Sequence, residues 1–92
     1  MDATQVVWSD YMRYRLRLRG FDIAAVEQIV RYSVERYTDT ATGRLVAVGR
    51  HDSRLILVPY DRDEDTLTPV TIHVTSRQQI NIRVRSGRFA NE

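Results

Sequence analysis

The amino-acid sequence predicts an α+β domain: two N-terminal helices packed on a four-stranded antiparallel sheet, with a short C-terminal helix or strand. Three observations support this class. Apolar residues recur with helical spacing between residues 10 and 32, residues 55–58 form a continuous apolar run, and apolar and polar residues alternate over residues 70–75. A chain of 92 residues with 42% hydrophobic content can build one small core, so we assign residues 1–92 to a single domain.

The first helix is expected over residues 11–19. Ser9 or Asp10 suits its N-cap, and Gly20 suits the position after its last turn. Residues 14–19 also alternate with a period of two, which fits a strand with one arginine face, but the caps favour the helix. The expected core-facing stripe consists of Tyr11, Tyr14 and Leu18, which Trp8 and Met12 can join.

A second helix is expected from Asp22, as its cap, to about Tyr32, and a hairpin turn is expected at residues 40–43. The chain turns again at residues 51–53 and at the acidic residues 61–65, which leads into a strand over residues 68–75. We expect the longest apolar faces to meet. This would pack Ile23, Val26 and Ile29 against Leu55, Leu57, Val70 and Ile72.

The C-terminal segment fits two structures. Ser76 as N-cap, with Ile80 and Val84 four residues apart, is typical of a short helix, whereas the alternation of Ile80, Ile82 and Val84 is typical of a strand. The helix is slightly favoured, and the strand remains the alternative.

Charge is the most informative feature of the composition. All fourteen basic residues other than histidine are arginine, and the net charge is +2. Arginine can grip phosphate or carboxylate with two parallel hydrogen bonds. Eight of the arginines form two clusters, one in the first helix (Arg13, Arg15, Arg17, Arg19) and one in the C-terminal segment (Arg77, Arg83, Arg85, Arg88).

Other features exclude several classes of protein. The absence of cysteine excludes disulfides, a thiolate nucleophile and a cysteine-ligated zinc site. Neither a signal peptide nor an apolar run of about 18 residues is evident, so we expect a soluble cytoplasmic protein without a membrane partner. The acidic residues 61–65 lack the glycine and the distal glutamate of a calcium loop, and no metal or cofactor is expected.

Five short segments carry a resemblance to known proteins. They are residues 17–21 (RLRGF), 36–40 (RYTDT) with Gly43, 69–73 (PVTIH), 75–80 (TSRQQI) and 85–89 (RSGRF). In these segments the chain resembles a bacterial family of small uncharacterised proteins that is similar in layout to the RelE, ParE and BrnT toxins. The resemblance implies a compact helix–helix–sheet domain, an RNA substrate at the ribosome and an antitoxin partner. RelE-like ribonucleases use arginines, lysines and a tyrosine, and here no lysine is present to serve.

Three residues are the candidates for catalysis. His73 has a side chain that titrates near neutral pH and could act as general base or acid, or simply be a half-exposed strand residue. Tyr60 could stack on a base or donate a proton, or pack over the sheet edge. Arg77 is the third candidate. The residues expected to bind RNA or a partner are Arg83, Arg85, Arg88, Gln78, Arg13 and Arg17, although the tail arginines could instead pair with acidic side chains.

Two functional hypotheses follow. The first is a RelE-like or BrnT-like ribonuclease, or a ribosome-associated RNA-binding protein, of a toxin and antitoxin pair. The second is a non-catalytic interaction module whose arginines meet an acidic protein partner or a second copy of the chain.

Overall fold

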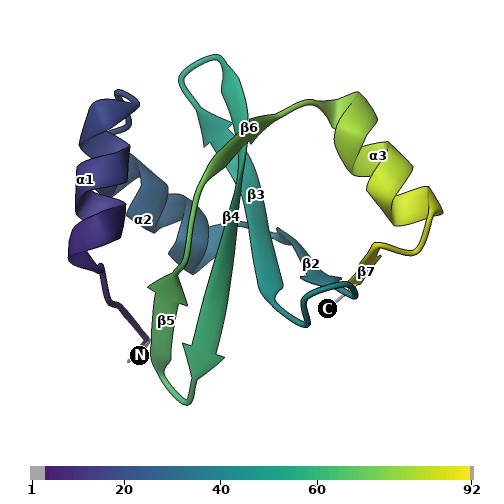
Figure 1. The fold of residues 1–92 in the computed structure, drawn as a ribbon, viewed down its shortest axis with the longest axis horizontal. Helices are drawn as coiled ribbons and strands as arrows, with labels where there is room; N and C mark the ends of the chain where they lie inside the picture. The colour runs from purple at the N-terminus through teal and green to yellow at the C-terminus, as the bar shows by residue number, and fades with distance from the viewer. Residues whose placement is uncertain (1–3, 92) are drawn as a thin grey trace.

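The computed structural model describes residues 4–91 and confirms the α+β class (Figure 1). Helices α1 and α2 lie on one side of a central sheet, and α3 lies on the other. The elements in chain order are β1 (Gln5–Val6), α1 (Asp10–Leu18), α2 (Ile23–Tyr32), β2 (Glu35–Asp39), β3 (Leu45–His51), β4 (Arg54–Asp63), β5 (Thr66–Pro69), β6 (His73–Thr75), α3 (Arg77–Arg85) and β7 (Phe89–Asn91).

The sheet is larger than the four antiparallel strands expected. It has seven strands in the order β1-β5-β4-β3-β2-β7, and β6 pairs with the other half of β4. Only the β1–β5 pair is parallel among the described strands. The strands that sequence reasoning missed, β1 and β7, have two and three residues, too few to show a period.

Both N-terminal helices form where expected. The Ser9 hydroxyl accepts a hydrogen bond from the Met12 N–H at 3.1 Å, and Gly20 adopts a φ of 74° just after α1. Asp22 holds the N-cap position of α2, but its side chain makes no capping bond. Its own N–H donates instead to Nε2 of His51 at 2.9 Å. His51 is therefore a buried residue at the end of β3, although the sequence predicts a turn beginning at this position.

The prediction that Tyr11, Tyr14 and Leu18 of α1 face the core is wrong. Met12 and Leu16 are the buried residues of this helix. Tyr11 and Tyr14 are each 57% exposed and Leu18 is 68% exposed. Two apolar stripes compete on this helix, and sequence spacing alone does not decide which one faces the sheet.

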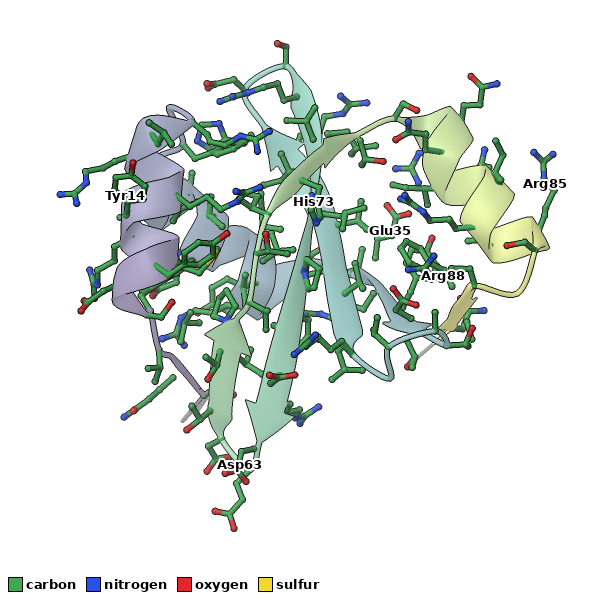
Figure 2. The ribbon with its side chains drawn as sticks, in the orientation of Figure 1. Tyr14, Glu35, Asp63, His73, Arg85 and Arg88 are labelled. Atoms are coloured by element: carbon green, nitrogen blue, oxygen red, sulfur yellow. The ribbon has the colours of Figure 1, made fainter. Side chains whose placement is uncertain are left out.

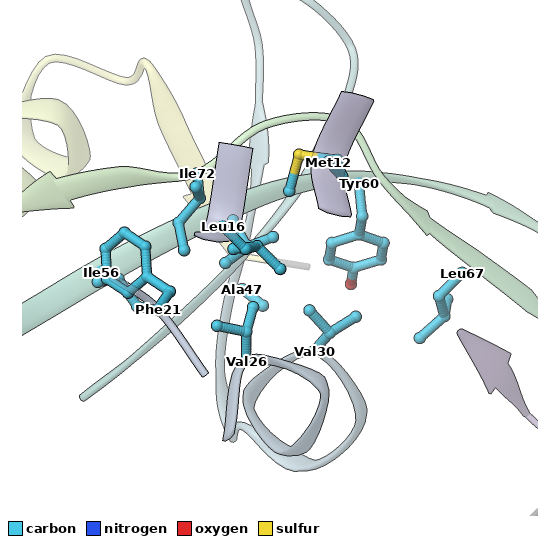
Figure 3. Packing of buried hydrophobic residues seen from close by; sticks show 11 residues of the cluster. Met12, Leu16, Phe21, Val26, Val30, Ala47, Ile56, Tyr60, Leu67 and Ile72 are labelled. Carbon is cyan, nitrogen blue, oxygen red and sulfur yellow. The ribbon is translucent and has the colours of Figure 1, made fainter. Parts of the chain in front are cut away.

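Strand β4 buries side chains on both of its faces. Ile56, Val58 and Tyr60 join the core beneath α1 and α2 (Figure 3). Leu55 and Leu57 face the opposite way and pack with Ile80 of α3. The expectation that Leu55 and Leu57 meet α2 is therefore wrong, because successive side chains of a strand point to opposite faces and the run is apolar on both.

The strand expected over residues 68–75 is interrupted. Tyr60 of β4 pairs with Pro69 of β5, and Leu57 of β4 pairs with His73 of β6. Between these two pairs, two residues of β4 oppose three residues, 70–72, of the segment that joins β5 to β6. This is a one-residue bulge. The bulge places Ile72 in the core beneath the helices, while Val70 lies on the other side of the sheet, so these two do not share the face predicted for them.

The C-terminal segment forms the predicted helix and not the alternative strand over residues 80–84, and a separate short strand follows it. Ser76 caps α3 by accepting from the Gln79 N–H at 3.2 Å, which confirms the helix. Gly87, with a φ of 82°, then turns the chain into β7, which pairs antiparallel with β2. Ile80 is the only buried residue of α3, so this helix contributes one side chain to the core on this side of the sheet.

Helix α2 approaches β3 closely at Gly49. A β-carbon at this position would lie 2.9 Å from Cγ1 and Cγ2 of Ile29. We expect Gly49→Ala to lower the free energy of unfolding by about 1–3 kcal/mol through overpacking. Chemical denaturation would measure the loss. It should shrink in an Ile29→Ala background, where the clash is removed, and an equal loss in both backgrounds would contradict this packing.

Candidate functional site

A groove of about 400 Å³ lies between the sheet and α3. Its apolar lining consists of three residues of the core on this side, Val46, Leu57 and Phe89, together with Pro59, Val70 and Val74. Polar and charged side chains complete the lining: Asp39, Thr42, Arg44, Thr71, His73, Thr75, Gln79, Arg83 and Arg88. The groove exists because α3 contributes only Ile80 to the core and does not cover the whole face.

Two ion pairs hold the C-terminal segment against β2. Arg77, the first residue of α3, contacts both carboxylate oxygens of Glu35 at 2.6 and 3.0 Å. Arg88, just before β7, contacts both carboxylate oxygens of Asp39 at 2.7 and 3.1 Å. Glu35 and Asp39 are the first and last residues of β2, so the two pairs tie the start of α3 and the start of β7 to opposite ends of this strand.

These ion pairs shift the acidity of the carboxyl groups. Hydrogen bonding from Arg77 holds the pKa of Glu35 below its ordinary value, and the Tyr37 hydroxyl donates to the same carboxylate at 2.7 Å. Hydrogen bonding from Arg88 likewise lowers the pKa of Asp39. Both carboxylates are therefore ionised at neutral pH, and the charges of Arg77 and Arg88 are already matched within the fold.

Arg83 differs from these two arginines. Within residues 4–91, it has no carboxylate partner, and its guanidinium carbon lies 5.5 Å from the centre of the Phe89 ring. It is half-buried and lines the groove. Arg85 is exposed and points away from the groove at the far end of α3 (Figure 2). Gln78 is exposed and does not line the groove.

His73 lies in β6 opposite Leu57 and lines the groove. Partial burial lowers the pKa of its imidazole, and the positive charges of Arg15, Arg19 and Arg83 lower it further. His73 is thus neutral at pH 7 and can accept a proton. Arg15 of α1, Arg19 just after it and Arg83 of α3 thus act on the same imidazole.

Tyr60 does not join His73 and Arg77. It is buried on the α1 and α2 face of the sheet, and its hydroxyl accepts a hydrogen bond from Nη1 of Arg36 at 2.9 Å. Neither Tyr60, 2% exposed, nor Phe89, 4% exposed, has a free ring face on which a base could stack. The structure therefore does not assemble the three expected catalytic residues, and only His73 among them lines the groove.

Arg13 and Arg17 lie elsewhere. Both are exposed on α1, on the other side of the sheet from α3, where they line a separate hollow between α1 and α2. The RNA-binding or partner-binding residues named from the sequence thus divide between two surfaces of the molecule.

Sequence reasoning missed Glu35 and Asp39. The available signal was the period of two in β2, which puts Glu35, Tyr37 and Asp39 on one face. Their partners are 42 and 49 residues away in the chain, so no local pattern links them.

Comparisons with protein-family models, curated proteins and solved structures found no match to this chain. Over residues 4–91, no helix has the length and apolar character needed to cross a membrane. In the same residues, no three histidine or acidic side chains gather as ligands for a metal ion.

The Asp39–Arg88 pair makes a prediction about pH. Because the folded state lowers the pKa of Asp39, its contribution to stability is present above the unfolded value of about 3.9 and is lost as the pH falls through the folded value. We expect Asp39→Asn to lower the melting temperature at pH 7. The difference from wild type should shrink as the pH falls below about 4, where the unfolded state first binds the proton, and should be lost once the folded Asp39 is also protonated.

The matched control is Asp63→Asn, because Asp63 is exposed at the tip of the β4–β5 hairpin (Figure 2) and has no ion-pair partner within residues 4–91. Thermal melts followed by circular dichroism from pH 7 to pH 3 would measure both variants. A melting difference for Asp39→Asn that is independent of pH would contradict the role of the ion pair.

Proposed function

We propose that this protein binds single-stranded RNA in the groove between the sheet and α3 and cleaves it without a metal ion. The observation that carries the proposal is that Arg83, which has no carboxylate partner within residues 4–91, lines the same groove as a neutral His73. A bound phosphate would neutralise the positive charge of Arg83, and arginine can bind a phosphate with two parallel hydrogen bonds.

The lining of the groove supports a nucleotide as the ligand. Its volume of about 400 Å³ lies within the usual range for small-ligand sites. The apolar side chains of Pro59, Val70 and Val74 are not buried and offer contacts to a base or ribose, and Thr75 and Gln79 offer polar contacts to hydroxyls and base edges. Because the Phe89 ring that lines the groove has no free face, bases would be held there by shape and apolar contact, so we expect little sequence preference.

The chemistry that fits these residues is a transesterification. Neutral His73 takes the proton from a ribose 2′-hydroxyl, whose oxygen forms a bond to the adjacent phosphorus. The bond from phosphorus to the 5′-oxygen breaks, and that oxygen takes a proton from the His73 imidazolium or from water. Arg83 stabilises the negative charge that develops on the phosphate oxygens. The products are a 2′,3′-cyclic phosphate and a 5′-hydroxyl.

RNA binding is tested by two arginines of the same helix. We expect Arg83→Gln to weaken binding and to make the slope of log affinity against log salt shallower by about 0.7, the value for one lost phosphate contact on a single strand. Arg85→Gln removes the same charge outside the groove and should leave affinity and slope unchanged. Fluorescence polarisation with a labelled 12-nucleotide RNA over a salt series would measure both.

Two results would overturn the RNA-binding part of the proposal. One is the absence of binding by the wild-type protein at low salt. The other is an equal effect of Arg83→Gln and Arg85→Gln, which would indicate nonspecific attraction by net charge and no use of the groove.

Cleavage is tested by pH and by His73→Gln. Because the neutral imidazole is the reactive form and its pKa is lowered, the rate should rise with pH and be half-maximal below about pH 6.5. We expect His73→Gln to reduce the rate about 10²- to 10⁴-fold at pH 7.5. RNA affinity at that pH should be unchanged, since neutral His73 contributes no charge. Intact RNA after incubation with wild type, or an equal rate for His73→Gln, would disprove cleavage by this residue.

A further inference from the structure

Helix α1 carries an apolar surface that the fold does not cover. Tyr11, Tyr14 and Leu18 are each more than half exposed, and they share one face of the helix at intervals of three and four residues. Figure 2 shows Tyr14 on the outer side of α1, away from the sheet. A contiguous exposed apolar stripe on a small domain is typical of an interaction surface.

A hollow of about 330 Å³ lies beside this stripe, between α1 and the start of α2. Leu16, Phe21 and Ile23 supply its apolar walls, and Arg13 and Arg17 also line it. A helix advances by about 100° per residue, so Arg13 and Arg17 lie between the hollow and the stripe of Tyr11, Tyr14 and Leu18. The stripe, the two arginines and the hollow therefore form one continuous surface, which we call the α1 surface.

The charge of the α1 surface is uncompensated. Neither Arg13 nor Arg17 has an ion-pair partner within residues 4–91. Asp22 is the only acidic residue lining the hollow, and Asp10 is the only acidic residue of α1. The surface thus combines apolar side chains with two arginines one helical turn apart. A complementary partner surface would have apolar side chains flanked by carboxylates.

We infer that the α1 surface docks an acidic, amphipathic helical segment of a partner protein. Apolar side chains on one face of that segment would fill the hollow and cover Tyr14 and Leu18. Carboxylates four residues apart would meet Arg13 and Arg17. This role is independent of the RNA groove, which lies on the opposite side of the sheet.

Other occupants fit the surface less well. A second copy placing α1 against α1 would bring two arginine-rich helices together, and like charges oppose such a contact. In the hollow, an RNA base could stack only on the ring of Phe21. That ring is already covered by the Arg54 guanidinium, 4.2 Å from its centre, and contacts His51 edge-on. Aliphatic walls from Leu16 and Ile23 favour a protein side chain over a base.

The probe is a labelled synthetic 18-residue peptide with leucines at helical spacing and glutamates elsewhere, compared with a peptide of the same composition in scrambled order. We expect the amphipathic peptide to bind at least tenfold more tightly than the scrambled one in fluorescence polarisation. The double variant R13E/R17E should reduce that binding at least tenfold. The control R62E/R85E changes the net charge equally at exposed arginines of β4 and α3 and should change the affinity less than threefold.

Each alternative gives a distinct result. Equal affinity for the two peptides would overturn the inference. Equal losses of peptide affinity in R13E/R17E and R62E/R85E would also overturn it, because they would show that only the net charge of the protein matters. Loss of RNA binding in R13E/R17E with peptide binding unchanged would assign the surface to nucleic acid instead. Self-association abolished by R13E/R17E, seen by sedimentation without peptide, would assign it to a second copy.

Thermal melts would verify that each variant folds. A second variant tests the same surface without changing its charge. Tyr14→Ser with Leu18→Ser changes no charge and alters only exposed side chains, so it should fold and still lose at least tenfold in peptide affinity. Undiminished peptide binding by this variant would overturn the inference. Arg83→Gln should bind the peptide normally, so failure of the RNA proposal and failure of this inference are distinguishable.

Discussion

Strand β4 is apolar on both faces, and the rest of the structure depends on covering both of them. Ile56, Val58 and Tyr60 need a layer on one side, which α1 and α2 supply. Leu55 and Leu57 need a layer on the other, which only the C-terminal segment is left to provide. Exposing either face would leave a contiguous apolar surface in water, so the chain must return across the sheet after β6.

The second layer is thin, and the groove is its consequence. Helix α3 buries a single residue, Ile80, and its ends are held by charge and by strand pairing more than by apolar contact. The Arg77–Glu35 and Arg88–Asp39 pairs are partly exposed, and such pairs contribute little individually. Each nevertheless ties one point of the C-terminal segment to an end of β2, so together they hold α3 in the position that places Arg83 at the groove.

The arginines of this protein therefore serve in different ways. Arg77 and Arg88 neutralise carboxylates within the fold, and Arg36 donates to the Tyr60 hydroxyl and to the Val30 and Ser33 carbonyls near the end of α2. Arg83, Arg13 and Arg17 keep uncompensated charge within residues 4–91, the first at the groove and the others on α1. The two proposals rest on this second group, because only charge that the fold leaves unmatched can contribute net attraction to a ligand.

The sequence by itself determined the α+β class, the limits of α1 and α2 and the cap of α3, because caps, glycines and helical spacing act over a few residues. Only the tertiary structure decided which stripe of α1 is buried, which face of β4 meets α2, and which carboxylates hold Arg77 and Arg88. Those outcomes depend on partners far along the chain. The same is true of His73: with the register of β5 continued, it would pair with Ile56 and face the helices, and the one-residue bulge at residues 70–72 turns it toward the groove.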